Sequence, residues 1–115
     1  MLTEQKRVTP AMEQAFRRVL DQKTTLASLD AQLRARQQEV EAISSDQGRL
    51  RENMKALKGS AEERALLQRY THQLDAQEDR LATLRSQISD LKARRERAGE
   101  QLDQILSEIT LNETF

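Results

Sequence analysis

His72 is the side chain of this sequence best suited to metal binding or to acid–base catalysis, but it has no obvious companion. The sequence has no second histidine and no cysteine. Zinc and di-iron centres need several such ligands that converge from neighbouring helices. Nor does the chain offer a nucleophile with a matching base, or a glycine-rich phosphate loop. We therefore expect a surface histidine, no metal or other cofactor, no small-molecule substrate and no enzymatic activity.

The densest basic run, Lys92, Arg94, Arg95 and Arg97, could contact phosphate. Glu96 interrupts it, and no aromatic residues alternate with it to stack on bases. The whole chain has 19 basic and 19 acidic residues and no net charge, so no overall field attracts nucleic acid. Nucleic-acid binding is not expected; an RNA-binding helical arm through residues 92–97 is kept as the alternative from another class.

His72 and the basic run at residues 92–97 lie within a heptad repeat, which predicts the helix that positions them. From residue 67 onward, seam residues recur at strictly alternating steps of three and four. This spacing is typical of a helix that buries one face against a partner helix in a left-handed coiled coil. The seam residues are Leu67, Tyr70, Leu74, Gln77, Leu81, Leu84, Ile88, Leu91, Arg95, Ala98, Leu102, Ile105 and Ile109.

A second heptad run precedes this one and predicts a helix over residues 10–58. Thr9 can cap this helix and Pro10 suits its first position. Its a and d positions, spaced from Met12 to Leu57, are apolar except for Gln22, Arg36 and Gln47. Residues 1–9 are expected to form a flexible lead-in. Residues 44–48 contain Gly48 and are the weakest part of this helix, but the seam keeps its frame through them and favours continuity.

Gly59 and Ser60 provide the stop and the restart between the two helices. Glycine can adopt the left-handed conformation that ends a helix, and Ser60 with Glu63 forms a capping box for the next helix. We expect a turn at residues 59–60, a second helix over residues 61–110 and a loosened tail at residues 111–115. The fold class is therefore all-α: two long helices in an antiparallel coiled-coil hairpin.

Two registers suit this hairpin. If seam residues pair so that their numbers add to 124, Gln47 and Gln77 share one layer, and a buried amide pair would set the register at some cost in stability. If the numbers add to 117, the turn is tighter and Gln22 lies beside Arg95. We favour 124.

Extra apolar residues lie beside the seam at the open end of the hairpin. Phe16 and Leu20 widen the stripe of the first helix, and Leu106 widens that of the second. Such a patch favours a covering partner. The partner would be a second copy, giving a dimer and a four-helix bundle, or an adjacent domain of a longer chain. A chaperone-like hairpin that holds unfolded clients is a further alternative.

No apolar run approaches the ~20 residues that span a bilayer, and the first residues lack the apolar segment of a signal peptide. We expect no membrane insertion. The absence of cysteine fits more than one compartment, so localisation stays open, with the cytoplasm as the default.

Four runs resemble the C-terminal helical region of a group of large, uncharacterised bacterial proteins: residues 8–15, 46–57, 67–70 and 74–81. In that group, a β-rich portion of unknown function precedes a long helix, a turn near an "RENxxAL" run and a second helix with "RY…L…QED". The resemblance implies that the chain is a fragment of a larger protein. If so, the run at residues 51–57 is the tip of the hairpin, and we hypothesise that Arg51 and Asn53 face outward there and contact a protein partner. The resemblance carries over no catalytic or binding residue.

Overall fold

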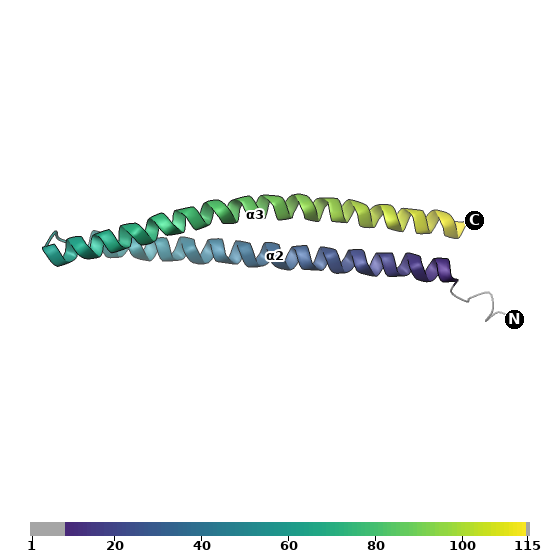
Figure 1. The fold of residues 1–115 in the computed structure, drawn as a ribbon, viewed down its shortest axis with the longest axis horizontal. Coiled ribbons are helices and arrows are strands. Elements are labelled where there is room, and N and C mark those ends of the chain that lie inside the picture. The colour runs from purple at the N-terminus through teal and green to yellow at the C-terminus, as the bar shows by residue number, and fades with distance from the viewer. Residues whose placement is uncertain (1–8, 115) are drawn as a thin grey trace. The chain divides into compact units, whose positions relative to one another are not determined.

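A computed structural model describes residues 9–114, with side chains as far as Thr110. It contains two helices, α2 (Pro10–Lys55) and α3 (Ala61–Thr114), and no strand within the described residues. In each part of the chain the two helices lie side by side in opposite directions (Figure 1). The predicted all-α helical hairpin is confirmed. The lead-in at residues 1–8 lies outside the described residues, and no described helix is long and apolar enough to cross a membrane.

The N-terminus of α2 is capped by Thr9. The hydroxyl Oγ1 of Thr9 accepts a hydrogen bond from the backbone N–H of Met12 at 3.1 Å, and its carbonyl accepts one from the N–H of Glu13 at 2.9 Å. The first of these bonds satisfies an N–H group that has no backbone partner inside the helix, and the second is the first i→i−4 backbone bond of the helix itself. Pro10 follows as the first helical residue, where its missing N–H costs nothing. The predicted start is confirmed.

α2 is unbroken through residues 44–48, as expected. Gly48 is exposed, with no atom within 4 Å of the position of an added Cβ, so no close packing requires a glycine there. Gln47 and Leu50 on the opposite face are buried at 5% and 0% exposure. Burial of this face against α3 therefore offsets the low helix propensity of the exposed face.

The end of α2 was predicted wrongly. The helix stops at Lys55, not at residue 58, and residues 56–60 form the turn. The N–H of Ala56 bonds the carbonyl of Asn53 at 3.3 Å, and that of Leu57 bonds Met54 at 3.2 Å, in the tighter spacing of a 3₁₀ turn. The N–H of Lys58 instead donates to Glu63 Oε2 at 2.6 Å, which draws the chain away from the helix.

The turn otherwise follows the prediction. Gly59 has a φ of 93°, in the left-handed region that suits glycine. The N–H of Glu63 donates to Ser60 Oγ at 3.1 Å, while Glu63 Oε1 accepts from the N–H of Ser60 at 3.2 Å. This reciprocal pair is the capping box expected at the start of α3.

The C-terminal boundary of α3 was also wrong. The helix continues to Thr114, four residues past the predicted end at Thr110, although a loosened tail was expected from residue 111. Residues 111–114 include neither glycine nor proline. Without either residue, nothing in this segment opposes continuation of the helix. Phe115 lies outside the described residues.

The chain divides into two compact units, each made from both helices. Unit 1 comprises residues 9–31 and 92–114 of the described chain, and unit 2 comprises Gln32–Leu91. Leu29 and Ala98 are the buried apolar residues of unit 1. The core of unit 2 is larger and is built from Leu33, Leu50, Leu81, Leu84 and Leu91.

The seam was predicted wrongly at its first step in α3. Leu67 is 38% exposed, whereas its neighbour Leu66 is half-buried and takes the inward position. The residue that would face Leu67 in the favoured register is Leu57, which lies in the turn beyond the end of α2. Without a helix opposite, the heptad frame does not apply to this turn of α3.

Hydrogen bonds between the helices support the register that adds to 124. The side chain of Gln77 donates a hydrogen bond to Asp46, and the two residue numbers add to 123. The side chain of Gln47 donates one to Glu78, and these numbers add to 125. In unit 1, Gln22 bonds Gln101, which again adds to 123. Gln22 thus lies beside Gln101 rather than beside Arg95.

Candidate interaction surfaces

Four large apolar side chains are exposed among the residues of unit 1 whose side chains the structure describes. Met12, Phe16 and Leu20 follow one another at four-residue steps along α2, with 37%, 44% and 63% of their surface exposed. Leu106 of α3 is 42% exposed. Phe16 and Leu106 each occupy the e position, directly after a d position of the seam. In an antiparallel pair of helices, the e positions of both helices lie on the same side of the seam. We call these four residues the apolar open-end face.

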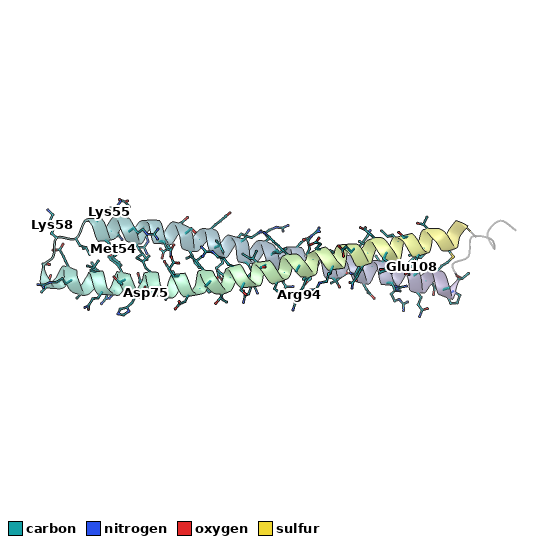
Figure 2. The ribbon with its side chains drawn as sticks, turned by 90° about the horizontal axis from the view of Figure 1, so that it is seen from above. Met54, Lys55, Lys58, Asp75, Arg94 and Glu108 are labelled. Carbon is teal, nitrogen blue, oxygen red and sulfur yellow. The ribbon has the colours of Figure 1, made fainter. Side chains whose placement is uncertain are left out.

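The opposite side of unit 1 forms a polar groove of about 250 Å³. Arg18 lies 3.6 Å from Glu108 across it, and Figure 2 labels Glu108 on α3. The side-chain amide of Gln22 donates to the carbonyl of Ala98 at 2.8 Å and to Gln101 Oε1 at 3.0 Å. This groove was missed from the sequence. The heptad pattern could have indicated it, because polar residues occupy the g positions of both helices in this unit: Arg18, Gln101 and Glu108.

Gln47 and Gln77 lie at the same level of unit 2, as the sequence predicted, but they do not bond each other. Gln47 Nε2 donates to Glu78 Oε1 at 2.9 Å, and Gln77 Nε2 donates to Asp46 Oδ2 at 2.6 Å. Each seam amide thus bonds the acidic neighbour of the other. Within the described residues, Gln77 Oε1 is buried without a hydrogen-bond partner. This polar layer is therefore only partly satisfied.

Arg36 and Arg95 occupy seam positions and carry their charged ends to the edge of the seam. Arg36 Nε donates to Gln87 Oε1 at 3.0 Å, and Arg95 Nε donates to Asp30 Oδ1 at 2.7 Å. Arg95 belongs to the basic run at residues 92–97, so part of that run is turned toward α2. His72 is exposed, as predicted.

Near the turn, Arg51 is exposed and Asn53 is half-buried. The hypothesised outward orientation therefore fits Arg51 better than Asn53. The carbonyl of Asn53 also accepts the N–H of Ala56, which helps end the helix. Asn53 is thus part of the turn as well as a candidate contact.

Three carboxyl groups hold their charge through interactions of the folded state. The guanidinium of Arg80 lowers the pKa of Glu39. Arg49 and then Gln77 lower the pKa of Asp46. The backbone N–H of Lys58 and the hydroxyl and N–H of Ser60 lower the pKa of Glu63.

These shifts predict acid sensitivity. A lowered folded-state pKa means that the unfolded chain takes up protons first, so stability is retained above the ordinary carboxyl pKa of about 4 and lost as pH falls through the folded value. We expect the melting temperature to be steady from neutral pH to about pH 5 and to fall below that. Thermal melts followed by circular dichroism measure this. The triple variant Glu39→Gln/Asp46→Asn/Glu63→Gln should show a shallower fall, and an equal slope would contradict the assignment.

No group of three or more histidine, cysteine, aspartate or glutamate side chains in the described part of the chain is arranged to hold a metal ion. The chain matches no protein-family model, no curated protein and no solved structure.

Proposed function

We propose that this chain is a non-catalytic structural module that mediates protein–protein interaction, and that it dimerises through the apolar open-end face. The observation that carries the proposal is the exposure of Phe16, Leu20 and Leu106 on one side of unit 1. Removal of apolar surface from water contributes roughly 25 cal/mol of favourable free energy per Å² buried. A clustered apolar face therefore favours a covering partner over solvent.

A second copy suits this face for two reasons. Phe16 and Leu20 lie four residues apart on one helix, so in a two-fold contact Phe16 of one copy can lie against Leu20 of the other, and reciprocally. The chain also has no net charge, so two copies meet without long-range repulsion. Two helices from each copy would then enclose the face as a four-helix bundle.

Sedimentation equilibrium at several concentrations tests the proposal. The wild type should have twice the mass of 13.3 kDa, and Phe16→Glu/Leu106→Glu should have the monomer mass with unchanged helicity, because charge on the face opposes its burial. The matched control is Gln14→Glu/Gln104→Glu, which adds the same charge at exposed positions outside the face and should stay dimeric.

A wild-type chain that is helical and monomeric at all concentrations would contradict dimerisation. The second candidate would then gain support: the chain is part of a larger bacterial protein of the kind that it resembles, and an adjacent domain covers the face. Adding that preceding domain in one polypeptide should in that case protect Phe16 and Leu106 from solvent, as hydrogen exchange or cysteine labelling at these positions would show.

A further inference from the structure

At the turn end of unit 2, several exposed basic side chains form no ion pair with any acidic side chain that the structure describes. Arg51 lies on α2, Lys58 in the turn, and Arg64 and Arg69 on α3, and all four are exposed. Within the described residues, the structure gives their side chains no hydrogen bond or ion pair. We call these four residues the cationic tip. Figure 2 shows Lys58 projecting from the turn.

Two of the acidic side chains nearby, Glu52 and Glu63, bond groups other than the side chains of the cationic tip. Glu63 accepts the backbone N–H groups of Lys58 and Ser60 at 2.6 and 3.2 Å. Glu52 Oε1 lies 3.0 Å from Lys55 Nζ.

Farther along α2, Asp46 pairs with Arg49 at 2.8 Å. Glu62 is the one acidic side chain between residues 49 and 69 that the structure leaves without such a contact. Residues 49–69 carry six basic and three acidic side chains, so this segment is locally positive although the chain as a whole is neutral. At physiological salt such a field extends about 8 Å, enough to act on a molecule that touches the surface.

An apolar side chain accompanies these cations. Leu67 is turned outward and is 38% exposed. It follows Arg64 by three residues, and residues three apart are neighbours on a helix surface. The tip thus offers guanidinium groups beside an apolar contact.

We propose that the cationic tip binds an acidic protein segment that carries an apolar side chain. Guanidinium groups pair with carboxylates through two parallel hydrogen bonds, and Leu67 would contact the apolar side chain. This inference goes beyond the proposed dimerisation, because it concerns a different surface and a partner of different chemistry.

Two other classes of partner fit the tip less well. Single-stranded nucleic acid is held by exposed aromatic side chains as well as cations, and Tyr70, the aromatic residue of this region, is half-buried. A membrane surface is bound by a helix with a continuous apolar face, whereas Leu67 is the one large apolar side chain exposed in unit 2 within the described residues.

Fluorescence anisotropy with the full chain tests the proposal. The probe is a labelled helical peptide built from glutamate, leucine and alanine, and its control replaces every glutamate with glutamine. The wild type should bind the acidic peptide, and Arg51→Gln/Lys58→Gln/Arg64→Gln/Arg69→Gln should bind it at least about tenfold more weakly. Leu67→Ser should weaken binding about threefold while helicity is retained.

The matched control is Arg17→Gln/Lys23→Gln/Arg34→Gln/Arg85→Gln. It removes the same charge from exposed cations outside the tip and should bind within about twofold of wild type. Equal losses in both quadruple variants, or no binding by wild type, would overturn the proposal. So would tip-dependent binding of single-stranded RNA or phosphatidylserine vesicles that is stronger than binding of the peptide. Phe16→Glu/Leu106→Glu should retain peptide binding, so failure of dimerisation is distinguishable from failure of the tip.

Discussion

Replacement of Leu84 by alanine should lower the free energy of unfolding by about 3 kcal/mol. Leu84 and Leu50 are the large side chains that the described structure buries completely. Truncation removes apolar area from the core of unit 2 and leaves a cavity that the surrounding side chains fill incompletely. Helix propensity does not add to the loss, because alanine is the best helix former.

Urea denaturation followed by far-UV circular dichroism measures this effect. Leu67→Ala is the matched control, since it makes the same chemical change in the same helix at a residue that is 38% exposed. Its cost should stay below about 1 kcal/mol. Equal costs at the two positions would contradict the burial of Leu84 in the core of unit 2.

Replacing the polar layer with leucine should have the opposite sign. Gln47→Leu/Gln77→Leu is expected to raise the free energy of unfolding by about 2 kcal/mol. The change removes the buried, unpartnered Gln77 Oε1 and places apolar side chains at two seam positions. The former partners, Asp46 and Glu78, are half-buried and exposed, so water can replace the lost hydrogen bonds.

The gain in stability should come with a loss of uniqueness. A polar residue at a seam position disfavours registers in which it would lack a partner. In the double variant, several registers become closer in free energy, and amide NMR spectra should show extra resonances for unit 2. Ser45→Ala, an exposed change on the outer face of α2, should leave one set of resonances. A double variant that is less stable than wild type would contradict the inference that the two glutamines lower the stability of the hairpin while they favour one register.

Much of the hairpin could be predicted from local sequence. Heptad spacing identifies the buried face without any knowledge of the partner, because a period of 3.5 residues keeps one side of a helix on its neighbour. Capping chemistry is equally local, since Thr9, Ser60 and Glu63 act on backbone groups within five residues. The exposed open-end residues Phe16, Leu20 and Leu106 were identified for the same reason, as apolar positions next to a known seam.

Contacts between the helices depended on tertiary structure. Gln47 and Gln77 were expected to face each other, but each reaches an acidic neighbour of the other, because flexible side chains choose among several acceptors at one level. α2 ends at Lys55, where the backbone N–H of Lys58 donates to Glu63, so no helix lies opposite Leu67 and that leucine is exposed. Sequence spacing determines which face of each helix is buried, because a period of 3.5 residues keeps one side on the neighbouring helix. The geometry of the pair determines which polar groups find a hydrogen-bond partner and which charged side chains have no ion pair.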